Sequence, residues 1–377
     1  MRIGIDARLL ESEMTGIGRL LREVLDRIPL LDKNNEYFLF SFAELENYRK
    51  KCFEIIPTGR NKLIPPKVYS PIWLNFILPR YIKKNNIDLF FSPSALIPQS
   101  NLKYKSIVLV GDVFHKVNKR FHPFFYRKYL DLFLNSSMEK SDLVLTISQN
   151  SKKDIINFYN IPEKKVKVVY LAADEKFKPR LLTIEQKEYL IRKYNLPSRF
   201  VLYVGIIDFR KNIDGIIEVA DILVNKKKKD IYFVLACGTP FRYKSVIGRS
   251  QKIKKGHFIF LKHAESKDTP FMYNLADIFF FPSFYEGFGL PPLEAMQSGI
   301  PVITSNTSSL PEVVSEGGIM REPNDYEGFA NDILKLLEDK NFYQEMRNKG
   351  IEQAKKFNWE NTTKEIIKLF NQTYETQ

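Results

Sequence analysis

The chain has 377 residues, a length that suggests two domains at about 150 residues each. Hydrophobic residues make up 44% and charged residues 27% of the sequence, which excludes a largely disordered or fibrous chain. Only two cysteines occur, so we expect neither a disulfide framework nor a cysteine-based zinc site, and a reducing, cytoplasmic location follows. The formal net charge of +14 favours an anionic partner: nucleotides, an acidic membrane surface or nucleic acid.

Short runs rich in Val, Ile, Leu and Phe alternate with helical patterns, beginning directly after Met1. This alternation is typical of stacked βαβ units around a parallel sheet, and it leaves no room for a signal peptide. No apolar run approaches the ~18 residues that a membrane span needs. The strands predicted in the first half are 2–7, 37–42, 88–93, 106–112, 142–148 and 166–172. The helices predicted between them are 18–28, 70–84, 123–140 and 151–159.

A charged stretch with two prolines, 175–199, is predicted to hold a linker and the first helix of a second domain. The strands predicted after it are 200–205, 231–238, 257–263, 277–283, 301–306 and 317–323. From Tyr326 the pattern is helical, with one helix ending and the last beginning at Trp359. We therefore predict an α/β chain of two six-stranded, Rossmann-like domains, with the ligand in the cleft at the carboxyl ends of their strands. The predicted limits are 1–176 and 177–359, and a C-terminal helix of about 360–377 packs back on the first domain.

The segment 282–313 is the most informative for chemistry, because Glu286 and Glu294 flank a glycine-containing loop with seven residues between them. The amides of Gly287, Phe288 and Gly289 and the start of the following helix would form an anion-binding concavity. Each carboxylate can accept hydrogen bonds from vicinal hydroxyls, one from a sugar ring and the other from a ribose. The alternative is that Glu286 is an ordinary loop residue and Glu294 an acid in the helix's first turn.

The string EGFGLPPLEAMQSGIPVI, 286–303, resembles the signature of glycosyltransferase family 4, retaining nucleotide-sugar enzymes of the GT-B double-Rossmann fold. Four other segments resemble family motifs in the same order, so the resemblance covers the whole chain: 15–25, 146–155, 204–212 and 357–361. The residues EGFGLPPLEAM and SSLPEV in this segment resemble those of a mannosyltransferase-like subgroup.

The resemblance implies roles for individual residues. Lys211 and Arg210 would neutralise the donor's diphosphate, Glu286 would bind the donor hexose, and Glu294 the ribose. The glycine loop with Gly287, Phe288, Gly289 and Leu290 would lie beside the donor, and Gly16 and Gly18 would close over the phosphate. The sequence has no Asp-x-Asp motif, so we expect no metal and no other cofactor.

The chain departs from the family pattern at Gly111-Asp112, where related enzymes usually read His-Asp. Asp112 is our candidate for orienting the acceptor or acting as a base. His115 is a candidate for the missing histidine's role, the alternative being that His115 and His122 are ordinary surface-loop residues. Ile206 stands where some members of the family carry an arginine.

These features predict a retaining glycosyltransferase that moves a hexose from a nucleoside-diphosphate sugar to a hydroxyl of a glycan or lipid-linked acceptor. A front-face mechanism is favoured, since no carboxylate is an obvious nucleophile. GDP-mannose is the first choice of donor, and UDP-hexoses remain open. The alternatives are a nucleotide-sugar epimerase on the same scaffold and a basic nucleic-acid-binding protein, which no recognisable motif supports. The oligomeric state is left open.

Two segments, 71–86 and 119–133, interleave aromatic and basic residues. They predict peripheral attachment of the first domain to the acidic inner face of the membrane. The alternative is a pair of core helices with solvated basic ends. The aromatic residues assigned to this surface are Trp73, Phe76, Tyr81, Phe124, Phe125 and Tyr126. The basic residues assigned to it are Arg80, Lys83, Lys84, Lys119 and Arg120.

Overall fold

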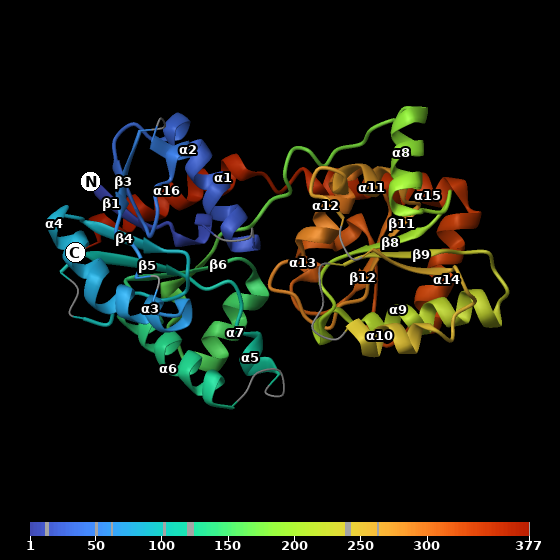
Figure 1. Ribbon diagram of the computed structural model, residues 1–377, viewed down its shortest axis with the longest axis horizontal. Coiled ribbons are helices and arrows are strands. Elements are labelled where there is room, and N and C mark those ends of the chain that lie inside the picture. The colour runs from blue at the N-terminus through green and yellow to red at the C-terminus, as the bar shows by residue number, and fades with distance from the viewer. Residues whose placement is uncertain are drawn as a thin grey trace. The chain divides into compact units, whose positions relative to one another are not determined.

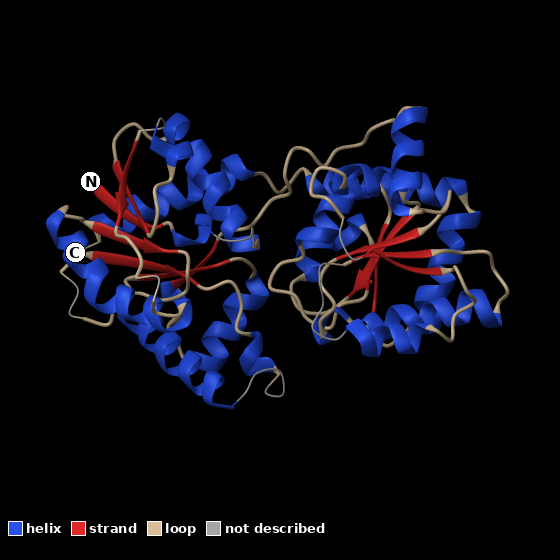
Figure 2. Cartoon of the chain, viewed as in Figure 1, coloured by secondary structure: helices blue, strands red, loops and turns tan. Residues whose placement is uncertain are grey.

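The computed structural model describes residues 1–11, 15–49, 52–61, 63–100, 103–118, 124–237, 243–261 and 264–376. The chain divides into two compact units (Figure 1). Unit 1 comprises Met1–Leu171 and Trp359–Gln377, and unit 2 comprises Ala172–Asn358. Each unit is a parallel sheet with helices on both sides (Figure 2), which confirms the predicted fold class. In the described part of the chain, no helix has both the length and the apolar character to cross a bilayer.

Unit 1 contains a seven-stranded sheet in the order β3-β2-β1-β4-β5-β6-β7. Its strands are β1 (Arg2–Asp6), β2 (Glu36–Ser41), β3 (Phe53–Pro57), β4 (Leu89–Ser92), β5 (Lys105–Leu109), β6 (Leu143–Thr146) and β7 (Val166–Val168). The prediction of six strands was wrong here, because it missed β3. This strand lies at the edge of the sheet, is only partly buried and ends in a proline, so it lacks the apolar run of an interior strand.

Helices of unit 1 are α1 (Gly16–Leu31), α2 (Glu46–Arg49), α3 (Pro66–Ile72), α4 (Leu78–Lys84), α5 (Phe114–Val117), α6 (Phe124–Lys140), α7 (Gln149–Tyr159) and α16 (Trp359–Glu375). Helix α16 packs against α1. Helix α1 begins where the Thr15 hydroxyl accepts a hydrogen bond from the Gly18 amide at 3.0 Å, an ordinary N-cap.

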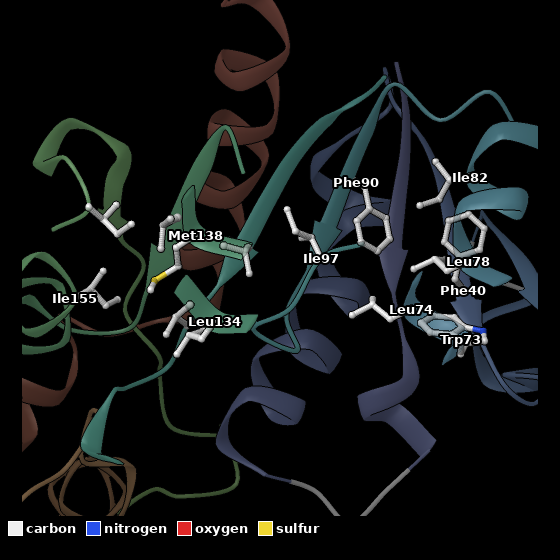
Figure 3. Packing of buried hydrophobic residues seen from close by; sticks show 14 of the residues in the cluster. Phe40, Trp73, Leu74, Leu78, Ile82, Phe90, Ile97, Leu134, Met138 and Ile155 are labelled. Carbon is white, nitrogen blue, oxygen red and sulfur yellow. The ribbon is translucent and has the colours of Figure 1, made fainter. Parts of the chain in front are cut away.

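A π-helical turn, Trp73–Ile77, joins α3 to α4 and keeps one face of this segment in the core. Tyr69, Trp73, Leu78 and Ile82 are all buried, and the spacing of five residues between Trp73 and Leu78 is the step that a π turn allows. Figure 3 shows Trp73 and Leu78 among the buried side chains of this cluster, near Phe40. The assignment of Trp73 to a membrane-facing surface was therefore wrong, since the indole is fully buried.

Unit 2 contains a six-stranded sheet in the order β10-β9-β8-β11-β12-β13. Its strands are β8 (Val201–Val204), β9 (Phe233–Ala236), β10 (Phe258–Leu261), β11 (Ile278–Phe281), β12 (Val302–Ser305) and β13 (Ile319–Arg321). Its helices are α8 (Ile184–Tyr194), α9 (Ile213–Ala220), α10 (Tyr243–Ser250), α11 (Thr269–Leu275), α12 (Leu290–Ser298), α13 (Leu310–Val314), α14 (Tyr326–Glu338) and α15 (Lys340–Ala354). Helices α9 and α10 lie on one side of this sheet and α11 and α12 on the other (Figure 1).

The strand orders place one topological switch point in each unit. In unit 2 the chain winds from β8 outward to β10 and then returns to β11 on the opposite side of β8. In unit 1 it winds from β1 to β3 and returns to β4 on the opposite side of β1. Ligands of open parallel sheets bind beside such a switch point, at the carboxyl ends of the strands.

Candidate active site

The loop that follows β8 carries the predicted diphosphate-binding residues of unit 2. Gly205 directly follows the strand, and a Cβ atom there would lie only 2.8 Å from the Tyr203 hydroxyl. Asp208 Oδ1 then accepts a hydrogen bond from the Arg210 amide at 2.9 Å and starts a short 3₁₀ turn, Phe209–Lys211. Asn212, in the left-handed conformation (φ 51°), caps α9. The sequence DFRKN thus makes two consecutive turns that fix the backbone of Lys211.

The loop that follows β11 carries Glu286, and serines of the next loop hold its backbone. The Glu286 amide donates to Ser308 Oγ at 2.8 Å, and its carbonyl accepts a hydrogen bond from Ser309 Oγ at 2.9 Å. The Phe284 amide donates to the Arg210 carbonyl at 2.7 Å, so the loops after β8 and β11 are joined directly. Neighbouring strands at the switch point therefore present Lys211 and Glu286 to each other.

Lys211 and Glu286 form a close ion pair at this edge. Lys211 Nζ lies 2.7 Å from both carboxylate oxygens, and the two side chains are only 12% and 9% exposed. The ammonium also lies 5.2 Å from the centre of the Phe281 ring, which stacks on Tyr203 at 5.5 Å. Burial raises the pKa of Tyr203 well above its ordinary value, so the phenol stays neutral and donates to the Ile206 carbonyl at 3.0 Å.

Glu294 belongs to a second cluster, on α12. That helix begins after Gly289 (φ 117°), and its two prolines lie in the first turn, where the missing amide hydrogens cost no intrahelical bond. The Glu294 side chain is buried, and Tyr273 donates its hydroxyl to Oε2 at 3.2 Å. Phe288 is also buried, and its carbonyl accepts a hydrogen bond from Ser309 at 2.6 Å. A buried carboxylate with hydrogen-bond partners is suited to a polar, neutral ligand group such as a diol.

Arg210 lies beside Lys211 but has a local acidic partner. Its Nε is 3.3 Å from Asp208 Oδ2, and its side chain is 23% exposed. Two cations and two acids therefore meet at the loops after β8 and β11. Among the described residues, no three His, Cys, Asp or Glu side chains gather as a metal-binding cluster.

Several residues of this site were missed in the sequence. Ser308 and Ser309 follow the strand predicted at 301–306, so the rule that carboxyl ends share one sheet edge would have found them. Tyr203, Tyr273 and Phe281 carry no such signal, because an aromatic residue in a strand or helix is ordinarily read as core. Their roles depend on side-chain directions that only the folded chain defines.

In unit 1 the two predicted glycines lie at the start of α1. Gly16 is the first residue of the helix and is partly exposed, whereas Gly18 is buried with its amide bonded to Thr15. Gly111 faces the same turn, since a Cβ atom there would lie 3.3 Å from Ile17 Cδ1. Ile17 thus occupies the space that a side chain at position 111 would need.

Asp112 accepts a hydrogen bond from the Phe114 amide at 3.0 Å, next to the start of α5. His115 is buried, not an ordinary surface-loop residue: its Nε2 lies 3.0 Å from Asp131 Oδ1 and 2.8 Å from the Tyr159 hydroxyl. Burial lowers the pKa of His115, and the opposing charge of Asp131 does not cancel the effect. His122, Lys119 and Arg120 lie outside the described residues, as do the side chains of Phe124, Phe125 and Tyr126.

Comparison with known proteins places each unit in a family. Residues 16–177 match the model described as Glycosyltransferase Family 4, and residues 186–357 match that of Glycosyl transferases group 1. The chain is 27% identical to O-antigen chain mannosyltransferase B of Escherichia coli, over 98% of this chain and 99% of that protein. It is also 31% identical to the serotype-specific mannosyltransferase WbdA of Escherichia coli. That match covers 74% of this chain but only 35% of the longer WbdA protein.

Solved structures share the fold at low sequence identity. Sucrose-phosphate synthase from Thermosynechococcus elongatus superposes with a TM-score of 0.78 at 16% identity, covering 100% of both chains. Anabaena HepE, solved in complex with UDP-glucose, has a TM-score of 0.73 at 16% identity, covering 99% of this chain and 100% of that one. With a family model over each unit and two Rossmann-like parallel sheets, the chain belongs to glycosyltransferase family 4 and is a glycosyltransferase of the GT-B fold.

Proposed function

We propose that this glycosyltransferase transfers mannose from GDP-mannose to a hydroxyl of a polysaccharide acceptor, with retention of configuration and without a metal ion. The buried Lys211–Glu286 pair at the switch point of unit 2 is the observation that carries the proposal. The choice of mannose is supported by the similarity, over nearly the whole chain, to an O-antigen chain mannosyltransferase. A UDP-hexose is the second candidate donor, supported by the UDP-glucose complex of the structural neighbour HepE.

The leaving group determines what Lys211 must do. A nucleoside diphosphate departs with about two negative charges, which a preorganised cation stabilises most in the transition state. An ammonium group has three N–H donors, so Lys211 can keep Glu286 and still donate to a phosphate oxygen. Glu286, already oriented by Lys211, accepts hydrogen bonds from hexose hydroxyls, and Glu294 accepts them from the ribose. The loop 287–290 adds backbone amides beside the phosphates, whereas Pro291 and Pro292 in the first turn of α12 have no amide hydrogen to donate.

Retention follows, in this proposal, from a front-face transfer. The departing phosphate takes the proton of the acceptor hydroxyl while that hydroxyl attacks the same face of the sugar. Asp112 orients the acceptor, and Gly16 is the glycine of this turn that we assign to the donor phosphate, because the buried Gly18 already donates its amide to the Thr15 hydroxyl. The Lys211 and Arg210 cations replace the charge that a divalent metal would supply.

The acceptor is proposed to be lipid-linked, and a surface of unit 1 supports contact with an acidic, cytoplasmic membrane face. Val68, Ile72 and Phe76 follow one another at intervals of four residues and are 54%, 37% and 65% exposed. The exposed Arg80, Lys83 and Lys84 continue along the same segment. An apolar stripe that ends in basic residues is suited to insertion among anionic headgroups.

Two assays test the function. A thermal-shift panel of GDP, UDP, ADP and dTDP identifies the donor base, because the preferred nucleotide raises the melting temperature most. GDP-mannose is then incubated with an α-linked mannose disaccharide, and the anomeric configuration of the product is read by NMR. Stabilisation by GDP and an α-linked product support the proposal. Preference for UDP contradicts the donor, a β-linked product contradicts retention, and an altered sugar without transfer indicates an epimerase.

A further inference from the structure

The switch point of unit 1 holds a second buried ion pair, in the position that Lys211 and Glu286 occupy in unit 2. Strand β1 ends at Asp6, Arg8 follows it, and Ser94 follows the neighbouring strand β4. Arg8 Nε lies 2.8 Å from Asp6 Oδ1 and Nη2 lies 2.7 Å from Oδ2, a two-pronged contact. Asp6 is fully buried, and the Arg8 side chain is 13% exposed.

The carboxylate of Asp6 is fully used within the protein. Besides Arg8, it accepts a hydrogen bond from Ser94 Oγ at 2.6 Å, and Ser94 in turn lies 3.1 Å from Ser92 Oγ. Burial by itself would raise the pKa of Asp6, but the Arg8 charge and these hydrogen bonds hold it below its ordinary value. Asp6 therefore serves to hold Arg8, and has no capacity left for a ligand.

The guanidinium of Arg8 retains capacity for a ligand. Its plane is fixed by the Trp73 ring, whose centre lies 4.1 Å from Cζ, and by Phe42 at 5.6 Å. Within the described part of the chain, its hydrogen bonds run through Nε and Nη2 alone, which leaves the two N–H groups of Nη1. The two N–H groups of Nη1 can donate to the oxygen of a sugar hydroxyl.

We propose that Arg8 Nη1, held by Asp6, Ser94 and Trp73, binds a hydroxyl of the acceptor sugar at the switch point of unit 1. The inference rests on the proposed function, which makes the acceptor a polysaccharide. The β4 loop is built tightly here, since Ser92 donates to the Leu96 carbonyl at 2.6 Å and Ala95 has a positive φ of 66°. Arg8 is thus a preorganised donor, and its hydrogen bond sets the affinity for the acceptor.

Arg8→Lys tests the proposal, because lysine keeps a cation for Asp6 but has no counterpart of Nη1. Rates are measured with GDP-mannose and the methyl glycoside of an α-linked mannose disaccharide. We expect the acceptor KM to rise ~10-fold or more, while the Kd for GDP changes less than about twofold. Ser94→Ala, which loosens Asp6 without removing a charge, should raise the same KM by a smaller factor.

The matched control is Arg321→Lys in unit 2. Arg321 also contacts one carboxylate through two nitrogens, those of Asp332, but its Nη1 is already bonded to Asp325 at 3.0 Å. This variant should lower the melting temperature comparably and leave the acceptor KM unchanged. An unchanged acceptor KM in Arg8→Lys, or a parallel loss of GDP affinity, overturns the assignment of Arg8 alone. No mannose transfer by the wild-type enzyme overturns the proposed function, and the acceptor assignment falls with it.

Discussion

Lys211 Nζ lies 2.7 Å from both carboxylate oxygens of Glu286, although 75 residues separate the two along the chain. The contact exists because β8 and β11 are neighbours in the sheet, so the loops that follow them meet. Both side chains are nearly buried, and neither charge is screened by solvent as a surface ion pair would be. Removing one partner therefore leaves an uncompensated buried charge and, in the proposed mechanism, also removes a catalytic group.

Lys211→Ala should lower kcat ~10²-fold or more, because the ammonium matters most as the diphosphate departs. It should also lower the free energy of unfolding by roughly 3 kcal/mol, since Glu286 is left buried without its cation. The double variant Lys211→Met/Glu286→Gln removes both charges and should recover much of that stability but no activity. Initial rates and urea unfolding measure the two effects. A double variant that regains activity along with stability would show that the pair is structural only.

Glu294→Ala should weaken GDP binding by about 1.5–3 kcal/mol, the usual worth of a hydrogen bond to a charged group. Tyr273→Phe, which removes the hydroxyl that orients Glu294, should cost less, about 0.5–1.5 kcal/mol. Isothermal titration calorimetry with GDP measures both. Tyr194→Phe is the matched control, because it removes a Tyr–Asp hydrogen bond of 2.7 Å to Asp268 in the same unit. Full GDP affinity in Glu294→Ala would remove Glu294 from the ribose site.

The sequence predicted the elements of this site better than its contacts. The prolines after Gly289 and the strand before Glu286 have local signals, turn chemistry and a continuous apolar run, so both could be placed from sequence. The bonds of Ser308 and Ser309 to the glutamate loop depend on two strands that are neighbours in space. The burial of His115, which contradicts only the surface-loop alternative, was not predictable for the same reason, because its partners Asp131 and Tyr159 come from two later helices.

The fold was predictable wherever a strand is interior, as with the buried run Ile278–Phe281. The edge strand β3 escaped because it needs only one buried face and one bonded neighbour. Trp73 was misplaced because aromatic and basic residues alternate along 71–86, and the π turn decides which of them face the core. The same segment still exposes Phe76, Arg80, Lys83 and Lys84. A helical period of 3.6 residues, applied to the sequence, would not have separated these residues from the buried Trp73.

Activity should persist in EDTA, since the proposed site uses Lys211 and Arg210 where other nucleotide-sugar enzymes use a divalent ion. Rates measured after dialysis against EDTA and with added Mg²⁺ or Mn²⁺ should agree within about twofold. As a positive control, a metal-dependent glycosyltransferase must lose its activity in the same buffer. Complete loss in EDTA, restored by Mg²⁺, would contradict the metal-free mechanism.

The stability of unit 1 should fall as the pH drops through the titration of His115. Its pKa in the folded state is lowered by burial, against the opposing effect of Asp131, while Lys116 lowers it and Asp112 raises it. The unfolded chain, with an ordinary pKa of ~6.5, therefore binds a proton that the folded chain resists. The contribution of the neutral His115 to the free energy of unfolding is complete above pH ~6.5. Below that pH it declines with a slope of at most about 1.4 kcal/mol per pH unit.

Urea unfolding between pH 8 and pH 5 measures that slope. His115→Gln cannot titrate in this range, so its free energy of unfolding should vary less with pH than that of the wild type. The pKa of Asp131 is also lowered in the folded protein. Its contribution to stability is therefore lost only near and below the ordinary Asp pKa of ~3.9, outside the range from pH 8 to pH 5. Identical slopes for the two proteins would mean that His115 does not resist protonation in the folded state.

Unit 1 should bind anionic vesicles reversibly through the stripe formed by Val68, Ile72 and Phe76 and the exposed Arg80, Lys83 and Lys84. Each basic residue near an anionic leaflet contributes roughly 1 kcal/mol, and screening above ~0.5 M salt should release much of the protein. Phe76→Ser and the triple change of the three basic residues to Glu should each reduce flotation with phosphatidylglycerol vesicles at low salt. Leu30→Ser, at another exposed apolar position of unit 1 (78%) outside both predicted membrane segments, is the control for the first variant. Changing Lys226, Lys228 and Lys229 of unit 2 to Glu is the control for the second variant, because it also reverses three positive charges but at another place. If each test variant floats as well as its control, net charge alone accounts for the attachment. If the wild type does not float at low salt, the surface has no affinity for the membrane.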